Sequence, residues 1–327
     1  MRAVARAFVS GGSGFLGGTL IATLRARGDE VVALARSDAA ERAVRERGAT
    51  AVCRGDVGDR AALVAGMQGC DVVHHCAGWV QPAGKLDEAR AVNAQGTQNM
   101  LDAARENGVA RFVHVSTESV LMDGRPLVRV DESTPYPARP LGPYAISKGE
   151  AERNVKRAAA EGLHACIVRP RAIWGRGDTV ALPRFCDAVR AGRFAWIGDG
   201  LHLTSTCHVE NVIEGMLLAA ERGGRGEVYF LSDGAPVVFK HWMSDMLATQ
   251  GLQAPDRSLP FGVARALGWA TDRVWSLLGK SEPPISDVVV ALIGQECTVV
   301  DDKARRELGY VGKVSMSQGM AGLRASC

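Results

Sequence analysis

Short apolar runs alternate with longer segments of helical pattern along the first half of the chain. Each run is short and rich in β-branched residues, as parallel strands buried on both faces usually are; the runs are 3–9, 31–35, 49–53, 72–75, 112–115 and 165–168. The segments 15–27, 61–67 and 86–107 between them are long enough for helices. This alternation predicts an α/β fold of the Rossmann type, a doubly wound parallel sheet with right-handed crossovers.

The regular alternation ends after Pro170. Glycine-rich segments at 174–178 and 196–200 predict loops, whereas 211–222 predicts a helix and 227–231 a strand. We therefore expect two parts. A Rossmann domain spans 1–172, with later contributions from about 203–233, and a smaller C-terminal substrate-binding lobe comprises 173–202 and 234–327.

The segment 261–279 has the pattern of an amphipathic helix. Apolar side chains recur at helical spacing and fall near one face: Val263, Ala266, Leu267, Ala270, Val274 and Leu277. Such a helix could be a lid over a pocket or a monotopic membrane contact. Because only two arginines accompany it, we favour the lid.

Composition narrows the class of protein without naming a function. The chain has 327 residues, of which 46% are hydrophobic and 23% charged, and its formal net charge is +3. These values are ordinary for a globular protein and give no electrostatic case for nucleic acid. No stretch approaches the ~20 apolar residues of a membrane span, and no secretory signal is evident, so we expect a cytoplasmic protein.

The eight cysteines are scattered and include no CxxC pair, which is typical of buried, reduced thiols. His74 and His75 are adjacent on a predicted strand, so their side chains point to opposite faces and cannot share one ion. We therefore expect no metal site.

A glycine-rich turn follows the first predicted strand. Gly11, Gly14 and Gly17 form a G-x-x-G-x-x-G variant of the dinucleotide fingerprint, lying between a strand and a helix as that motif requires. Gly11 permits the tight turn, Gly14 allows backbone to approach a pyrophosphate, and Gly17 allows close helix–sheet packing. The pyrophosphate would lie on the amides at the helix start, with Ser13, Phe15 and Leu16 around it.

The end of the second strand distinguishes the two nicotinamide cofactors. An acidic residue there would bind the adenosine ribose of NAD, whereas this chain has Arg36 and Ser37, which can bind the 2′-phosphate of NADP. A surface arginine without a ligand is the alternative. We expect NADP, with NAD as the alternative, and we place Asp56 and Val57 near the adenine.

Tyr144 and Lys148 stand four residues apart, which puts both on one face of a helix. Hydride transfer to a ketone creates an alkoxide that needs a proton. A phenol has an ordinary pKa near ~10 and is a poor proton donor at neutral pH unless its phenolate is stabilised. A neighbouring ammonium provides that stabilisation, and Lys148 could also bind the nicotinamide ribose.

Together these stretches resemble the extended short-chain dehydrogenase/reductase superfamily, of the NAD(P)-dependent epimerase/dehydratase kind, over nearly the full chain. The matching stretches are SGGSGFLGG at 10–18, GDV at 55–57, VVHHCAG at 72–78, VNAQGTQNML at 92–101, VSTESV at 115–120, YAISK at 144–148, RPRAIWGRGD at 169–178, HVEN at 208–211 and DDKARRELGY at 301–310. Within it, the ending ECTVVDDKARRELGY and the hydrophobic segment before it are most similar to the 3β-hydroxysteroid dehydrogenase-like branch.

The resemblance implies roles for further residues. Thr117 would hydrogen-bond the substrate oxygen, with Ser116 as the alternative if the alignment shifts by one residue. Asn93 would support the active-site hydrogen bonds, although a purely structural asparagine is an equal alternative. The cofactor would also be lined by two short segments, Cys76, Ala77 and Gly78 after the fourth strand and Arg169 and Pro170 after the sixth.

The resemblance implies an oxidoreductase that interconverts a hydrophobic ketone and a secondary alcohol, such as a steroid-like, aryl or long-chain carbonyl compound. The apolar residues of the C-terminal lobe, including several tryptophans, could line such a pocket, although most of them would serve as core. The alternatives are a nucleotide-sugar epimerase or dehydratase with tightly bound NAD, and a nicotinamide-binding regulatory protein. By resemblance we also expect a homodimer.

Overall fold

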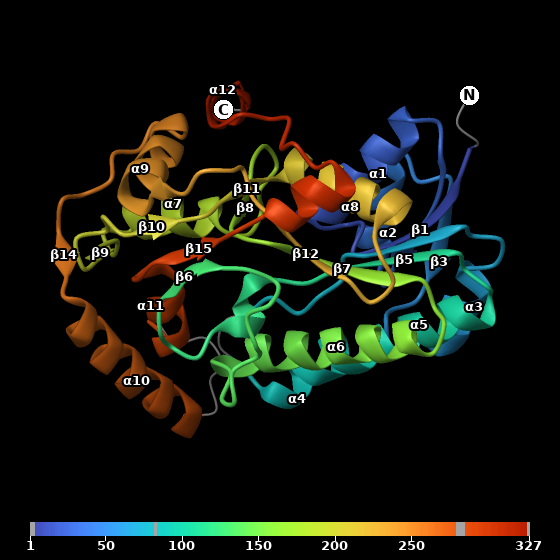
Figure 1. Ribbon diagram of the computed structural model, residues 1–327. Helices are drawn as coiled ribbons and strands as arrows, with labels where there is room; N and C mark the ends of the chain where they lie inside the picture. Colours follow the sequence, from blue (N-terminus) through green and yellow to red (C-terminus); the bar gives the residue numbers. More distant parts are fainter. Residues whose placement is uncertain (1–3, 82–83, 279–284, 326–327) are drawn as a thin grey trace.

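The computed structural model describes residues 4–81, 84–278 and 285–325. A large sheet covered by helices on both faces adjoins a lobe of short strands and helices (Figure 1). None of the helices in these ranges is long and apolar enough to cross a membrane.

Seven parallel strands form the central sheet in the order β12-β7-β5-β4-β1-β2-β3. The strands are β1 (Arg6–Ser10), β2 (Glu30–Ala35), β3 (Ala51–Arg54), β4 (Val72–His75), β5 (Arg111–Val115), β7 (Ala165–Pro170) and β12 (Val228–Leu231). They correspond to the six predicted apolar runs and the later predicted strand, so the Rossmann fold is confirmed. Strand order reverses between β1 and β4, and ligands of such sheets bind outside the carboxyl ends of the strands at this point.

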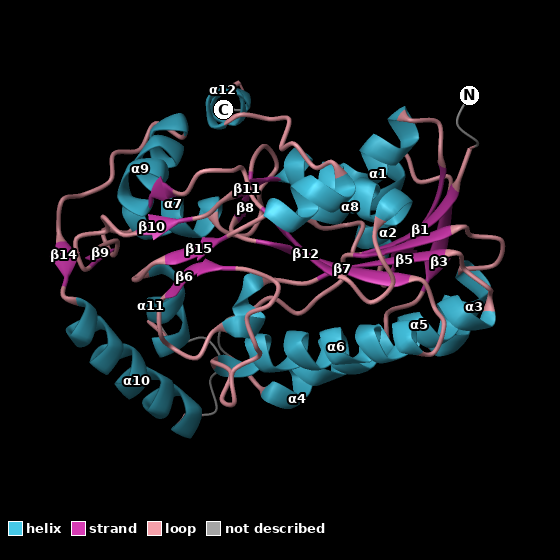
Figure 2. Ribbon diagram, in the orientation of Figure 1, coloured by secondary structure: helices cyan, strands magenta, loops and turns pink. Residues whose placement is uncertain are grey.

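Helices cover the two faces of the sheet (Figure 2). One face carries α1 (Phe15–Ala26), α2 (Asp38–Glu46) and α8 (Val209–Arg222); the other carries α3 (Arg60–Gly66), α4 (Leu86–Ala89), α5 (Gly96–Glu106) and α6 (Gly142–Ala160). A π-helical turn, η1 (Arg90–Gln95), joins α4 to α5. Each face has its own buried apolar cluster, so the strands are apolar on both sides, as their sequence predicts.

The lobe contains a four-stranded sheet of β13 (Val237–Val238), β10 (Leu203–Thr204), β15 (Cys297–Val299) and β6 (Leu127–Val130). Of these, β6 and β10 come from segments that the sequence analysis expected in the Rossmann domain. Two further pairs join β11 (Cys207–His208) to β8 (Ile173–Trp174) and β14 (Ser258–Leu259) to β9 (Trp196–Ile197). The lobe also has α7 (Leu182–Arg190), α9 (Phe239–Thr249) and α12 (Met316–Arg324). Its buried core includes three tryptophans, namely Trp174, Trp196 and Trp242.

The predicted helix of segment 261–279 is present as α10 (Phe261–Leu277), packed against α11 (Asp287–Ile293). Its orientation corrects the lid interpretation, which turned the apolar face inward over a pocket. The six residues of that face are exposed to solvent, and the helix meets the protein through the opposite face, at Ala264 and Gly268.

Candidate active site

The glycine turn brings β1 very close to the end of β4. Gly11 has a positive φ of 72°, and a Cβ there would lie 2.6 Å from the backbone nitrogen of Ala77. At Gly17, a Cβ would lie only 2.3 Å from the carbonyl oxygen of Gly11. Both positions therefore exclude any side chain, which explains the two glycines by geometry.

The same turn leaves the start of α1 open. Ser13 and Gly14 are exposed, Phe15 and Leu16 are half-buried, and within the described residues no side chain caps the helix. The free amides at the start of a helix of this length favour an anion, so the glycine turn and the start of α1 fit a pyrophosphate.

The predicted adenosine side lies at the ends of β2 and β3. Arg36 is exposed, and Ser37 caps α2 by accepting a hydrogen bond from the Ala40 amide, which leaves its hydroxyl proton available. Asp56 is exposed, with one oxygen accepting a hydrogen bond from the Gly58 amide, and Val57 is buried. The side chains of Arg36, Ser37 and Asp56 are thus accessible to a ligand.

Tyr144 lies in the first turn of α6 beside the loop that follows β5. The Thr117 hydroxyl donates a hydrogen bond to Glu118 Oε2 at 2.9 Å and lies within hydrogen-bonding reach of the phenol. Burial first, and the Glu118 carboxylate second, raise the pKa of Tyr144, while its interaction with Thr117 opposes them. The phenol is therefore held in its protonated form.

Lys148 follows one turn later and is buried in the sheet–helix boundary. Its ammonium donates to the Val115 carbonyl oxygen at 2.6 Å and lies 3.3 Å from His114 Nε2. Burial lowers the pKa of Lys148 to about 8, although the charges of Glu152 and Cys76 oppose this. Burial also lowers the pKa of His114 well below its ordinary value, so His114 is a neutral acceptor for the ammonium.

Asn93 lies in the π-helical turn η1, a feature often found at functional sites. Its amide nitrogen donates to Ser147 Oγ and to the Trp79 carbonyl oxygen, each at 3.0 Å, and its Oδ1 accepts from the Trp79 amide at 2.7 Å. Asn93 therefore ties the segment after β4, which holds Cys76 to Gly78, to the helix that carries the Tyr–Lys pair.

Ser116 and Thr117 are neighbours in different surroundings. The Ser116 hydroxyl is buried and has no hydrogen-bond partner among the described residues, whereas Thr117 lies beside Tyr144. Of the two alternatives for the substrate oxygen, Thr117 is the one beside the phenol.

Arg169 has a role that the sequence prediction did not include. Its guanidinium forms a bidentate ion pair with Glu152, at 2.8 and 2.6 Å, and lies between the rings of Tyr136 and Phe230. Both charged groups are almost fully buried. Two of the three guanidinium nitrogens of Arg169 are thus used by this pair, Nη1 has no hydrogen-bond partner within the described ranges, and Pro170 beside it is buried.

A second buried ion pair connects the site to the lobe. Glu118, in the short helix η2 (Glu118–Leu121), pairs with Arg171 at 2.9 Å, and Arg171 donates to the Leu292 carbonyl oxygen at the end of α11. The sequence analysis missed Glu118, Arg171 and His114. The signal was available, since each is a polar residue within or beside an apolar strand segment, and Glu118 and Arg171 also lie within family motifs.

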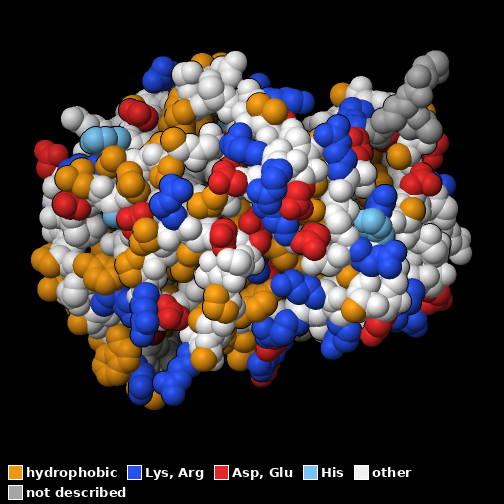
Figure 3. All heavy atoms as spheres, in the orientation of Figure 1, with side chains coloured by type: hydrophobic (Ala, Val, Ile, Leu, Met, Phe, Trp, Pro, Cys, Tyr) orange, Lys and Arg blue, Asp and Glu red, His pale blue; other side chains and the backbone are white. Residues whose placement is uncertain are grey.

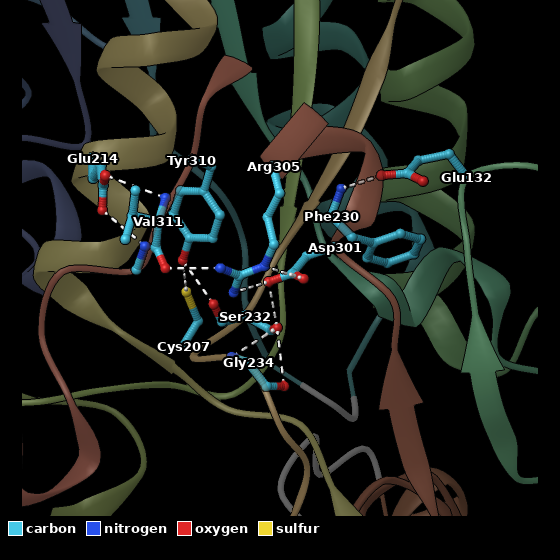
Figure 4. A network of polar contacts seen from close by, with 11 residues as sticks. Glu132, Cys207, Glu214, Phe230, Ser232, Gly234, Asp301, Arg305, Tyr310 and Val311 are labelled. Carbon is cyan, nitrogen blue, oxygen red and sulfur yellow. Dashed lines mark hydrogen bonds and ion pairs between the residues drawn. The ribbon is translucent and has the colours of Figure 1, made fainter. Parts of the chain in front are cut away.

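The predicted family motif at 301–310 stabilises the C-terminal segment rather than the reacting groups (Figure 4). Asp301 binds Arg305 and accepts from Ser232 Oγ at 2.8 Å, and the Tyr310 hydroxyl donates to the Ser232 carbonyl oxygen at 2.7 Å. Glu214 of α8 accepts the backbone amides of 311–313. This network fixes the C-terminal segment against β12 and α8.

Comparisons with known proteins identify the family. The model of the 3-beta hydroxysteroid dehydrogenase/isomerase family matches residues 8–261. A Stigmatella aurantiaca protein, 4-hydroxy-2-methyl-3-oxo-4-farnesyl-3,4-dihydroquinoline-1-oxide ketoreductase, is 48% identical over 98% of this chain and 96% of its own. A 2-alkyl-3-oxoalkanoate reductase of Stenotrophomonas maltophilia (strain K279a) is 33% identical over 97% and 98%.

Among solved structures, gox2253 superposes with a TM-score of 0.78 at 26% identity, covering 98% of this chain and 97% of that one. Fold, glycine turn, Tyr–Lys pair and sequence similarity all lead to the same assignment: the chain is an oxidoreductase of the 3-beta hydroxysteroid dehydrogenase/isomerase family, within the extended short-chain dehydrogenases/reductases.

Proposed function

We propose that this protein reduces the ketone of a lipophilic substrate with NADPH. The proposal rests on one observation, the contact of Thr117 with Tyr144. Tyr144 lies one helical turn from the buried Lys148, and the same sheet bears the open glycine turn. The names of the two relatives, which describe ketone reduction on farnesyl- and alkyl-bearing molecules, support a lipophilic ketone.

In the reductive direction, Thr117, Tyr144 and Lys148 would each have a separate role. Bound NADPH would supply the hydride to the carbonyl carbon. Thr117 would donate a hydrogen bond to the carbonyl oxygen, and Tyr144 would transfer its proton to that oxygen as negative charge develops. Lys148 would stabilise the resulting phenolate. Its ammonium has three donors, so one remains for the nicotinamide ribose beside those directed at Val115 and His114.

The direct test is to follow oxidation of NADPH and NADH with long-chain 3-oxo compounds, aryl ketones and steroid ketones. We expect turnover of at least one class, faster with NADPH. The epimerase alternative requires retained NAD, conversion of a nucleotide sugar and no net nicotinamide turnover. That result would replace the reductase proposal.

Replacing Thr117 with alanine should lower kcat by about 100-fold, because one donor to the developing oxyanion is lost. Thr117→Ser should restore most of the rate, since it keeps the hydroxyl. Ser116→Ala is the matched control, and we expect it to stay within a few-fold of the parent protein. Steady-state kinetics measure all three, and a larger loss in Ser116→Ala would reverse the assignment.

Replacing Arg36 with alanine should raise KM for NADPH about tenfold to a hundredfold and leave KM for NADH nearly unchanged, because charge-assisted hydrogen bonds to the 2′-phosphate are lost. Arg42→Ala removes another exposed arginine on the adjoining helix and serves as the control. Equal effects on both cofactors would contradict the NADP preference.

The rate of ketone reduction should fall at alkaline pH with an apparent pKa near 8, the pKa of the buried Lys148. As pH rises through this value the ammonium loses its charge, and the phenolate of Tyr144 loses its stabilisation. A profile of kcat against pH tests this. A rate that stays constant to about pH 10, where free lysine titrates, would contradict it.

A further inference from the structure

Two histidines of the central sheet are buried beside the catalytic lysine. Figure 3 shows His side chains on the molecular surface, whereas His75 of β4 and His114 of β5 are fully buried. The two residues are opposite each other on neighbouring strands, and their ring centroids lie 5.1 Å apart. Buried ring nitrogens normally have hydrogen-bond partners. The partners of these two rings differ.

Both ring nitrogens of His75 have hydroxyl partners. Its Nδ1 lies 2.7 Å from Ser10 Oγ, and its Nε2 lies 2.9 Å from Thr97 Oγ1. Ser10 is the last residue before the glycine turn, and its Oγ also accepts from the Ala77 amide at 3.2 Å. Residues of β1 and α5 therefore fix the ring of His75, and the ring of His114 packs against it.

The ring of His114 has a partner at one nitrogen only, within the part of the chain that the structure describes. Its Nε2 lies 3.3 Å from the Lys148 ammonium, and its Nδ1 has no partner. An ammonium can only donate, so Nε2 is the acceptor and the ring proton is on Nδ1. A buried N–H without an acceptor is unfavourable, and a valine like Val113 or Val115 would avoid it. The contact with Lys148 is what the histidine provides and an apolar residue would not.

The groups around Lys148 determine when it carries a charge. Those that face it are His75 and Cys76 at the end of β4, His114 on β5 and Glu152 on its own helix. Burial holds both histidines neutral and raises the pKa of Cys76 to about 12, and Arg169 keeps Glu152 ionised. Of these groups, only Lys148 changes its charge between about pH 6 and pH 10. A hydrogen-bond acceptor for the ammonium favours its charged form and so raises its pKa.

We propose that His114 is a positioning residue of the active site, whose Nε2 holds the Lys148 ammonium in place and in its charged form. The contact does not depend on the reaction, but its effect on the rate rests on the proposed function. The Val115 carbonyl oxygen, at 2.6 Å, holds the ammonium from the backbone and His114 holds it from a side chain. The third N–H then remains directed for the nicotinamide ribose.

The pH profile of kcat in a matched pair of amide variants tests the proposal. The amide of a glutamine can occupy the place of His114 Nε2, whereas the shorter asparagine can occupy only that of Nδ1, out of reach of Lys148. His114→Asn should move the alkaline limb of the profile to lower pH by about one unit, because the ammonium loses an acceptor. Its kcat should thus be close to that of the parent at about pH 6 and about tenfold lower above about pH 9. His114→Gln should keep the parental limb.

Two further variants complete the set. His114→Phe keeps a ring without an acceptor and should share the shifted limb of His114→Asn, so the test does not depend on the folding of one variant. His74→Asn is the matched control. His74 is also buried on β4 and its Nδ1 also lacks a partner among the described residues, but it does not contact Lys148, so the limb should not move.

Nitrogen-15 NMR of histidine-labelled protein tests the contact without any turnover. We expect His114 to carry its proton on Nδ1, and its Nε2 resonance to shift as Lys148 titrates near pH 8. The signal that is missing from the spectrum of His114→Gln assigns the resonance.

Three results would overturn the proposal: a proton on Nε2 of His114, a parental alkaline limb in both His114→Asn and His114→Phe, or a loss of rate in the His114 variants that is equal at every pH. The last is expected of a residue that only packs in the core. A protein that reduces no ketone would instead reject the reductase proposal, and the NMR spectrum would still decide whether His114 holds Lys148.

Discussion

Replacing Tyr144 with phenylalanine should lower kcat for ketone reduction by about 100- to 10,000-fold, the range of a lost general acid. The substitution keeps the ring and removes only the hydroxyl, whose proton is held by burial and by the Glu118 carboxylate. Binding of NADPH, followed by its fluorescence, should change little. The rate loss should therefore be seen in kcat rather than in cofactor affinity.

A matched control removes a buried hydroxyl far from the reacting groups. Tyr229→Phe loses a phenol that accepts a hydrogen bond from the Gly224 amide at the edge of the sheet, and should leave kcat within a few-fold. If Tyr144→Phe kept more than about a tenth of the parent rate, another group would be the proton donor.

Replacing Arg169 with methionine should lower the free energy of unfolding by about 3–5 kcal/mol, because Glu152 would be left buried without its partner. Arg169 is 2% exposed and Glu152 is fully buried, so water cannot compensate. Urea denaturation with linear extrapolation measures the loss. The exposed pair Arg27–Glu221 provides the comparison, and Arg27→Met should cost less than about 1 kcal/mol.

The double substitution Arg169→Met and Glu152→Met separates the cost of an unpaired charge from the value of the pair. It should be more stable than Arg169→Met alone, since apolar residues of similar volume can replace a buried ion pair. A double variant that is less stable than either single variant would contradict this explanation. The stability lost in Arg169→Met should also depend on pH.

Burial alone would raise the pKa of Glu152, but the hydrogen bonds and charge of Arg169 outweigh it and hold the pKa below its ordinary value. The stabilisation by this pair is therefore present above the ordinary pKa of a glutamate and is lost as pH falls through the lowered one. Arg169→Met should show a smaller loss of stability on acidification than the parent protein.

Periodicity and composition were sufficient for the strands of the central sheet, because each is buried on both faces and therefore reads as a continuous apolar run. The same reasoning was insufficient for the lobe. Its strands β8 and β9 have two residues each, too few for any period to be recognised, and both were expected to be loops. Strand β6 comes from the segment before α6 yet pairs with β15, a contact between distant parts of the chain.

The candidate active site likewise has one part that the sequence predicts and another part that it does not. The glycine turn and the Tyr144–Lys148 pair are local patterns, since their spacing alone puts the groups together on a turn or one helical face. The partners of these groups come from elsewhere in the chain. His114, Glu118 and Arg171 lie on other elements, and the bond between Arg169 and Glu152 turns an expected cofactor-lining side chain into part of the core.

The sequence by itself thus determined the Rossmann sheet, the phosphate-binding turn and the tyrosine–lysine pair, all of which depend on residues close together in the chain. Only the tertiary structure decided that Thr117 rather than Ser116 lies beside the phenol and that the apolar face of α10 points to solvent. Neighbouring strand residues face opposite ways, and an amphipathic helix can be attached by either face. Both choices depend on packing against distant residues, which periodicity does not record.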